Sequence, residues 1–273
     1  MRHVLTIARR ELKLGFRNPW AYAFMTLFAV FSLALLLVQS RADMGGYTSS
    51  TGSMINLILY LLPLMAVLLG SFSFTGEKEE GGWRLLSSFP LSSRAYMWGK
   101  YVGLAFVLVL IVSFGFGLSG VIGALFGQAL SSEAFGRFFV LSALLIAMFL
   151  GLSAILGALC RNRWQALTYG VGIWFFLVLG WPTLLLSVLG FLPYLWIKPA
   201  LVSLVFVNPA ELNRLFLIVK MGGGSVLGPD YYKWVEWIER PSGSYWFALV
   251  CLAWIVLSVE IAIRLWERGR GRE

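Results

Sequence analysis

Three carboxylates lie close together in the most polar stretch of the chain, residues 75–100. They are Glu77, Glu79 and Glu80, and long apolar runs lie on both sides of the stretch. Carboxylates at this spacing form charge-assisted hydrogen bonds with basic groups. A short helix with apolar side chains is predicted to follow them, and the backbone dipole favours negative charge at its N-terminus. An acidic turn, a short helix and a basic exit together predict a surface that grips a soluble partner.

The other residue types that could do chemistry argue against an enzyme. The single histidine, His3, is near the N-terminus, and Cys160 and Cys251 are far apart inside apolar runs, without the spacing of a disulfide or a metal site. No G-x-x-x-x-G-K-[ST] phosphate-binding loop occurs, and no carboxylate pair falls in the middle of an apolar run, as a proton relay would require. We therefore predict no catalytic residue, no metal and no cofactor. Any transport must draw its energy from another polypeptide.

Composition places these residues in a polytopic membrane protein. Hydrophobic residues make up 59% of the chain and charged residues 13%, and the mean hydropathy of +0.80 is far above soluble averages. The net charge of +9 comes from bases scattered at the ends of apolar runs. This distribution is typical of topology signals and lipid headgroup contacts, and not of nucleic-acid binding. The predicted fold class is all-α, with one transmembrane domain over residues 1–273.

Six membrane spans are predicted from apolar runs long enough to cross a hydrocarbon core of about 30 Å. They cover residues 20–38, 54–74, 101–126, 138–160, 166–190 and 245–263. A seventh span at 183–207 is an alternative, but two prolines and Lys198 interrupt it. It would also place the arginine-rich tail, residues 264–273, outside. Basic residues gather in the segments that six spans place on the inner side, so we expect both termini in the cytoplasm, at the inner membrane.

The N-terminal segment, residues 2–18, is predicted to be an amphipathic elbow helix that lies in the membrane interface. One face carries apolar side chains and another carries a basic stripe: Leu5, Ala8, Leu12 and Phe16 on the first, Arg9, Lys13 and Arg17 on the second. Asn18 and Pro19 then break the helix before the first span.

The long segment 191–244 carries two further helix signals, which we expect on the outer side of the membrane. Asn208 and Pro209 are typical of a helix start, and apolar side chains follow at i, i+3, i+4 and i+7. A shorter amphipathic pattern covers residues 230–239. Both helices should lie on the membrane or cap the helix bundle. Their exposed charged side chains are candidates for binding an extracytoplasmic partner: Glu211, Arg214, Glu236 and Glu239.

The sequence GEKEEGGWRLLSSFPLSSRAYMWGK resembles the first cytoplasmic loop of ABC-2-type (type V) exporter permeases. Members share a Gly-Glu-x-Glu-x-Gly motif, a Leu-rich turn, a proline and a Gly-Lys pair, here Gly99 and Lys100, that enters the next span. The resemblance implies that the loop forms a coupling helix that docks on a cytoplasmic ATPase subunit, and that residues 2–18 are the family's elbow helix. The residues it assigns to coupling are Glu77, Glu79, Glu80, Gly81, Trp83, Leu85, Leu86, Phe89 and Pro90.

A narrower resemblance connects the chain with permeases of the transporter that helps to mature the copper centre of nitrous-oxide reductase. It rests on GIWFFLVL in the fifth span, on Asn208-Pro209-x-Glu211-x-x-Arg214-Leu215 and on Leu227-Gly228-Pro229. It implies a periplasmic maturation protein as a partner, and a sulfur species or copper as cargo. Soft copper ligands should cluster, whereas Met44, Met54 and Met221 are dispersed. A copper relay through this chain is therefore the weaker alternative.

Small residues recur at every fourth position in two of the spans. Ser119, Gly123 and Gly127 form one such stripe, which allows two helices to pack closely. Six spans are also half of the usual twelve-helix permease. We therefore predict a homodimer, or a pair with a homologous partner.

Three classes of function stay open. The first is the permease of an ATP-driven exporter, with a maturation cargo or with a drug or lipid cargo. The second is a permease-like subunit that relays ATP hydrolysis mechanically to an extracytoplasmic partner without moving cargo. The third is a membrane scaffold or enzyme that has no ATPase partner, which a neighbouring gene for a Walker-motif ATPase would exclude.

Overall fold

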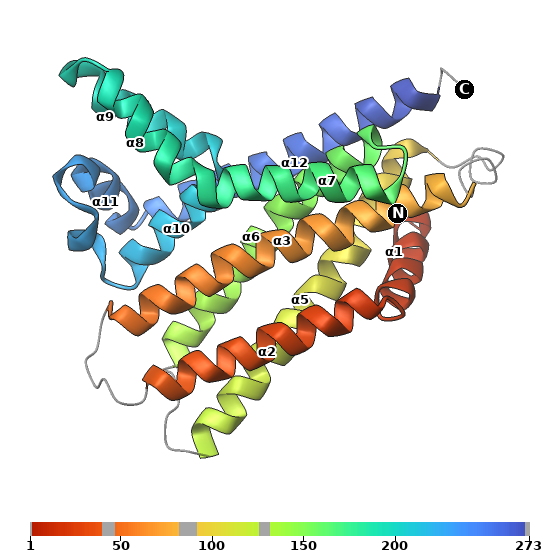
Figure 1. Cartoon of the computed structure of the whole chain (residues 1–273), viewed down its shortest axis with the longest axis horizontal. Helices are drawn as coiled ribbons and strands as arrows, with labels where there is room; N and C mark the ends of the chain where they lie inside the picture. The colour runs from red at the N-terminus through yellow and green to blue at the C-terminus, as the bar shows by residue number, and fades with distance from the viewer. Residues whose placement is uncertain (1, 40–46, 82–91, 126–131, 271–273) are drawn as a thin grey trace.

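The computed structural model describes residues 2–39, 47–81, 92–125 and 132–270, and every regular element in these ranges is helical (Figure 1). The helices are α1 (Arg2–Gly15), α2 (Pro19–Gln39), α3 (Ser49–Glu79), α5 (Ser93–Leu125), α6 (Ser132–Leu159), α7 (Arg163–Trp174), η1 (Phe175–Gly180), α8 (Trp181–Phe191), α9 (Tyr194–Val207), α10 (Pro209–Lys220), η2 (Gly224–Leu227), η3 (Pro229–Tyr231), α11 (Tyr232–Glu239) and α12 (Gly243–Arg270). This confirms the all-α prediction for the described part of the chain.

Five helices in these ranges are long and apolar enough to cross a membrane. They are Thr51–Glu79, Ser93–Leu125, Glu133–Leu159, Arg163–Phe191 and Gly243–Arg268. The bent pair Leu195–Val207 and Pro209–Lys220, which turns by 106°, makes a sixth if it counts as one span. The first span predicted from the sequence corresponds to the apolar helix α2. The chain is therefore a membrane-embedded protein with several apolar helices.

Two of the expected helix boundaries lie elsewhere. The apolar run at 54–74 continues as helix to Glu79, and α5 begins at Ser93, so both ends of the expected loop at 75–100 are helical. Hydropathy marks where a helix leaves the hydrocarbon, but a helix continues until its backbone is broken. Here Gly81, with a φ of +70°, provides that break after α3.

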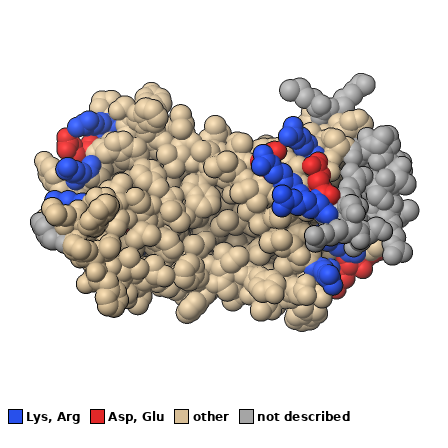
Figure 2. Space-filling view, turned by 90° about the horizontal axis from the view of Figure 1, so that it is seen from above, with Lys and Arg blue, Asp and Glu red and all other residues tan. Residues whose placement is uncertain are grey.

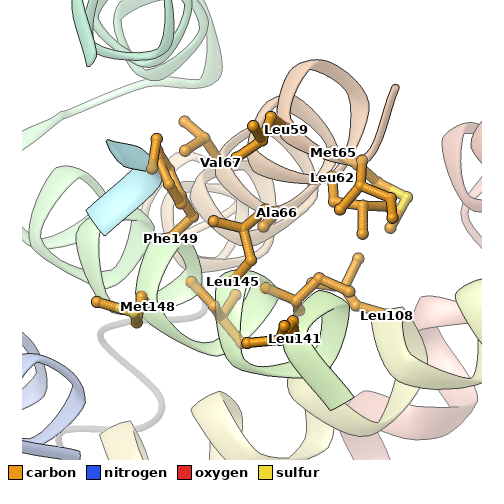
Figure 3. Close-up of a cluster of buried hydrophobic side chains, with 14 of the residues drawn as sticks. Leu59, Leu62, Met65, Ala66, Val67, Leu108, Leu141, Leu145, Met148 and Phe149 are labelled. Atoms are coloured by element: carbon orange, nitrogen blue, oxygen red, sulfur yellow. The ribbon is translucent and has the colours of Figure 1, made fainter. Parts of the chain in front are cut away.

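The core lies where α3 packs against α6 and α5 (Figure 3). Leu62 and Ala66 of α3, Leu145 and Phe149 of α6, and Leu108 of α5 are all buried in this cluster. Their packing explains why the three helices are apolar on the faces they share.

Small residues bring these helices close within the chain. A Cβ added at Gly151 of α6 would lie 2.8 Å from the Cβ of Ser258 on α12, and Gly157 approaches Phe74 of α3 even more closely. Of the stripe on α5, Ser119 and Gly123 are buried, while Gly127 lies outside the described residues. Close helix packing inside one chain therefore accounts for Gly151 and Gly157.

The helices α7, η1 and α8 follow one another without a break and end in a hairpin with α9 that projects from the bundle (Figure 1). Phe175–Gly180 forms a π-helical segment, a local widening of the helix that often occurs at functional sites. The hairpin leaves large apolar side chains exposed. Phe191 is 90% exposed and Leu195 is 84% exposed, so this face needs either lipid or protein to cover it.

The segment after α9 is a cap on the bundle. Asn208 begins α10 as predicted, because its Oδ1 accepts hydrogen bonds from the backbone N–H groups of Ala210 and Glu211. However, nearly every side chain of α10 is buried, and Glu211 is only 4% exposed. The prediction of an exposed Glu211 is therefore wrong, because helix-start signals do not report what a helix packs against. The shorter α11 is amphipathic, with Trp234 buried.

Charged side chains gather at the two ends of the molecule in Figure 2, and the broad surface between them shows none. The helix α1, the predicted elbow helix, and the C-terminal part of α12 lie at the same end of the bundle (Figure 1). An ion pair of 3.1 Å between Arg94 and Glu260 also joins the start of α5 to α12 at this end. An uncharged band between two charged ends is the surface expected of a protein embedded in a bilayer.

Candidate functional site

The predicted coupling acids lie at the C-terminal end of α3. Glu77 and Glu79 are in its last turn and Glu80 is its C-cap, with Gly81 directly after. The short helix expected to follow the acids falls on residues 82–91, outside the described residues. Negative charge at a helix C-terminus is unfavourable, so neighbouring bases must compensate. The other predicted coupling residues lie outside the described residues: Trp83, Leu85, Leu86, Phe89 and Pro90.

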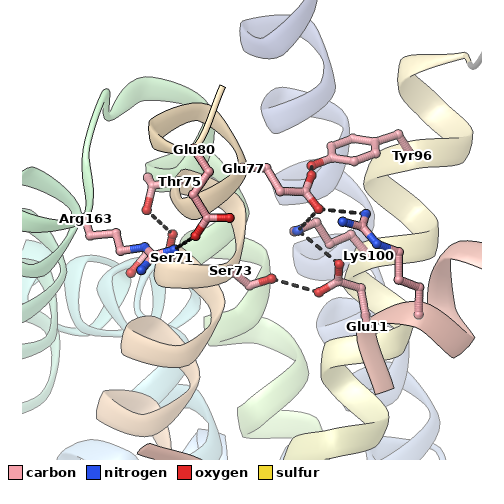
Figure 4. Close-up of polar contacts among 10 residues, drawn as sticks. Glu11, Ser71, Ser73, Thr75, Glu77, Glu80, Tyr96, Lys100 and Arg163 are labelled. Carbon is pink, nitrogen blue, oxygen red and sulfur yellow. Dashed lines mark hydrogen bonds and ion pairs between the residues drawn. The ribbon is translucent and has the colours of Figure 1, made fainter. Parts of the chain in front are cut away.

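Glu77 receives this compensation from three sides (Figure 4). The Nη1 atom of Arg10 on the elbow helix lies 2.9 Å from its Oε1, and the Nζ atom of Lys100 on α5 lies 3.1 Å from the same oxygen. The hydroxyl of Tyr96 donates a hydrogen bond to its other oxygen. One carboxylate at the end of α3 thus joins α1, α3 and α5.

Glu11 and Lys100 form the deepest part of the site. Lys100 is 1% exposed and Glu11 is 2% exposed, and Nζ lies 3.1 Å from Oε1. Ser73 of α3 donates a hydrogen bond of 2.8 Å to the other oxygen of Glu11. The Lys100 ammonium also lies 5.7 Å from the centre of the Phe74 ring, within cation–π range.

We refer to Arg10, Glu11, Glu77 and Lys100 as the charge cluster. Two acids and two bases balance one another, and each ion has at least one partner of opposite sign within 3.1 Å. Burying an ion costs several kcal/mol unless it is paired and hydrogen-bonded. The cluster is therefore an arrangement in which the loss of any one member leaves another charge uncompensated.

Glycines on α5 let the elbow helix α1 pack closely against α5. A Cβ added at Gly103 would lie 2.6 Å from the Cβ of Glu11, and one at Gly99 would lie 2.8 Å from the Cβ of Ile7. Gly15 in turn faces Val107 of α5. The packed face of α1 therefore contains Ile7, Glu11 and Gly15, which are spaced by four residues.

This face differs in part from the predicted one. Leu12 and Phe16 do pack against the core, but Leu5 is 60% exposed. The basic stripe of Arg9, Lys13 and Arg17 is exposed, as predicted. The sequence contains a signal for Glu11, which is the one acid among the bases of α1 and shares a face with Ile7. Apolar periodicity alone does not single it out.

A second set of contacts joins α3 to the turn between α6 and α7. The Nε atom of Arg163 lies 3.5 Å from Glu79, and its Nη2 atom pairs with Glu80. Lys78 donates hydrogen bonds to the backbone oxygens of Ala158 (2.7 Å) and Cys160 (3.2 Å) at the end of α6. These contacts place Glu79 and Glu80 beside the turn between α6 and α7.

The cysteines give little support for metal chemistry. Cys160 and Cys251 are free and buried. Within the part of the chain that the structure describes, no three His, Cys, Asp or Glu side chains could hold a metal ion together.

The four outer candidates do not form one exposed patch. Glu211 is buried and pairs with Arg214 at 2.9 Å. Glu236 is exposed and pairs with Arg240 at 2.8 Å, and Glu239 is exposed. Only α11 therefore presents predicted partner-binding charges at the surface.

This difference leads to a labelling prediction. A Glu236→Cys variant should react with an impermeant maleimide in whole cells, because the side chain is exposed and α11 is expected outside the cytoplasm. Asn213→Cys is the matched control, since Asn213 is 3% exposed and should stay unlabelled. The two buried native cysteines should add little background. Labelling of Glu236→Cys only after the inner membrane is opened would reverse the orientation.

Relatives of this chain agree with the membrane architecture. The family model of ABC-2 family transporter proteins matches residues 5–269. The probable ABC transporter permease protein NosY of Stutzerimonas stutzeri is 32% identical over 277 residues, which cover 98% of this chain and 99% of the relative. The protein of the same name from Pseudomonas aeruginosa is 36% identical over 279 residues, with 97% and 98% covered. The chain therefore belongs to the ABC-2 transporter family and is a membrane-embedded permease subunit of an ABC transporter.

Proposed function

We propose that this permease is driven by a separate cytoplasmic ATPase that docks on the segment at 75–100. The observation that carries the proposal is the charge cluster, because it fastens both ends of that segment to the elbow helix. The last turn of α3 contributes Glu77, and the first turns of α5 contribute Tyr96 and Lys100. A displacement of the segment would therefore move α1, α3 and α5 as one unit.

The contacts of Arg163 extend this unit. Glu79 and Glu80 pair with it across the turn between α6 and α7, so a second cytoplasmic turn would follow the same displacement. In this proposal Glu77 holds the elbow helix, and the more exposed Glu79 and Glu80 face the docking side. Trp83, Leu85, Leu86 and Phe89 would provide the apolar anchors of the ATPase contact.

The topology that fits this function has six spans, with α2 as the first, and both termini in the cytoplasm at the inner membrane. The bent pair α9–α10 then caps the outer end without crossing. An extracytoplasmic partner would meet α11 and its exposed Glu236 and Glu239.

We further propose that two copies of this chain form the transport unit with two ATPase subunits. The support for this step is the exposed apolar hairpin of α8 and α9, which one chain alone leaves uncovered. Intact mass measurement of the detergent-extracted complex should show two permeases. A complex with one copy and no homologous permease would contradict the homodimer.

For the cargo, the relatives named NosY and the short motifs of the fifth span support a role in nitrous-oxide reductase maturation. The buried and separate cysteines favour a sulfur species over copper. A purely mechanical subunit that drives a periplasmic maturation protein is the second candidate, and a drug or lipid exporter is the third.

Purification of the tagged chain from its native membrane tests the core of the proposal. A soluble ATPase with Walker motifs should co-purify, and its ATP hydrolysis should respond to reconstitution with the permease. Cargo accumulation in inside-out vesicles would then separate an exporter from a mechanical subunit. A chain that purifies without any ATPase from an otherwise intact membrane would overturn the proposal.

A further inference from the structure

A cavity of about 610 Å³ opens beside the charge cluster, between the elbow helix and helices α2, α3 and α5. Its lining has two parts. Charged side chains line one part, and the other is apolar, with Leu14, Trp20, Leu69, Phe72 and Leu104 among its residues. A ligand for this cavity therefore needs a charged group and a hydrophobic portion.

The charges of the lining leave one base in surplus. Four bases and three acids line the cavity, and each acid is paired: Glu11 with Lys100, Glu77 with Arg10 and Lys100, and Glu80 with Arg163. Arg17 is the remaining base; it is exposed, and none of the ion pairs found in the described ranges involves it. The amide of Asn18 also lines the cavity, and its Oδ1 accepts from the backbone N–H of Trp20, which leaves Nδ2 to donate.

The apolar part faces the level of a membrane interface. Trp20 is half exposed, and its ring packs edge-on against Phe72 at 6.3 Å. Tyr22, two residues later, is also half exposed. Tryptophan and tyrosine favour the headgroup level of a bilayer, and further exposed apolar side chains follow along α2, such as Phe31.

We propose that this cavity binds an anionic glycerophospholipid of the leaflet in which the elbow helix lies. The headgroup phosphate would lie against the Arg17 guanidinium and the Asn18 amide. An acyl chain would lie along Leu14, Trp20 and Phe72. A soluble phosphate would satisfy Arg17 but would leave the apolar wall exposed to water, so the amphipathic lining favours a lipid.

The bound lipid would lie between α1 and the pair α2–α3, where it fills space that protein atoms leave empty. It would thereby support the elbow helix against the helices that line the cavity. This is a separate claim from coupling, because it needs neither the ATPase nor residues 82–91.

The test is lipid binding by the purified full chain, measured with native mass spectrometry after exchange from phosphatidylglycerol micelles into mild detergent. Arg17→Glu should weaken retention of phosphatidylglycerol by about tenfold or more, since a base near an anionic headgroup is replaced by a like charge. Lys13→Glu is the matched control, because Lys13 is an exposed base four residues before Arg17 that does not line the cavity. It should retain the lipid as the wild type does.

Two further measurements make the result decisive. Leu14→Trp should reduce retention by filling the cavity, because Leu14 lines it and is partly exposed, so the larger ring can be accommodated. Inorganic phosphate should not displace the lipid. Equal losses for Arg17→Glu and Lys13→Glu would show that the elbow attracts headgroups only through its overall charge. Full retention by Leu14→Trp, or displacement by phosphate alone, would also overturn the proposal.

Discussion

Replacing Lys100 with methionine should destabilise the folded chain by about 3–5 kcal/mol, the cost of breaking a buried ion pair by removing one partner. The substitution leaves Glu11 without its cation in a site where the carboxylate is 2% exposed. It also takes one of two bases away from Glu77. The elbow helix should then separate from α5. Thermal unfolding in detergent measures the stability, and limited trypsin digestion at the bases of α1 measures the release.

Two matched variants test whether the broken ion pair causes the loss of stability. Lys233→Met removes an exposed lysine and should change the stability by no more than about 0.5 kcal/mol. The double variant Lys100→Met with Glu11→Gln removes one base and one acid, which leaves Arg10 paired with Glu77. It should be more stable than the sum of the two single changes predicts, by about 0.5–3 kcal/mol. Additive effects, or a Lys100→Met variant as stable as the wild type, would show that the cluster does not hold the elbow.

Replacing Leu85 and Leu86 with aspartate should release the ATPase from the membrane, while replacing Glu79 and Glu80 with lysine should uncouple transport and leave the complex assembled. The leucines are the predicted apolar anchors, and interface energy concentrates in few such residues. The acids are exposed and pair with Arg163 at the surface, where an ion pair contributes at most about 1 kcal/mol. Co-purification and ATP hydrolysis measure the two effects separately.

A charge-reversal experiment identifies the basic group with which Glu79 and Glu80 interact during coupling. If Arg163 is the functional partner, adding Arg163→Glu to the two lysine substitutions should restore coupling. If the acids act on a base of the ATPase, the triple variant should stay uncoupled. Wild-type association and transport in both the leucine and the glutamate variants would mean that this segment is only a connector.

The sequence predicted the positions of the helices better than it predicted where they end and which helices pack against one another. Long apolar runs identify spans because a backbone in hydrocarbon must satisfy its own hydrogen bonds. They do not identify helix ends, since no residue between 75 and 79 breaks a helix and α3 continues to Glu79. At the other end, Ser92 caps α5, with the backbone N–H of Ala95 donating to its hydroxyl.

The candidate site shows the same limit. The carboxylate of Glu77 could be singled out from its motif, but its partner Arg10 lies 67 positions away in the chain. Only packing of α1 against the glycines of α5 brings the two together. The sequence also does not show that Glu211 is buried. A helix-start motif is the same whether the helix lies at the surface or packs in the interior.

The two sets of ion pairs around the end of α3 should respond differently to the ionic strength of the medium. Arg163 and its partners are between 41% and 68% exposed, so mobile ions reach them, and at 0.15 M salt the screening length is about 8 Å. Lys100 and Glu11 are closed to the solvent and keep their full attraction. Rising salt should therefore loosen the turn between α6 and α7 from α3 while the elbow helix stays fastened. This end of the permease thus contains one set of ion pairs that salt weakens beside another that salt leaves intact.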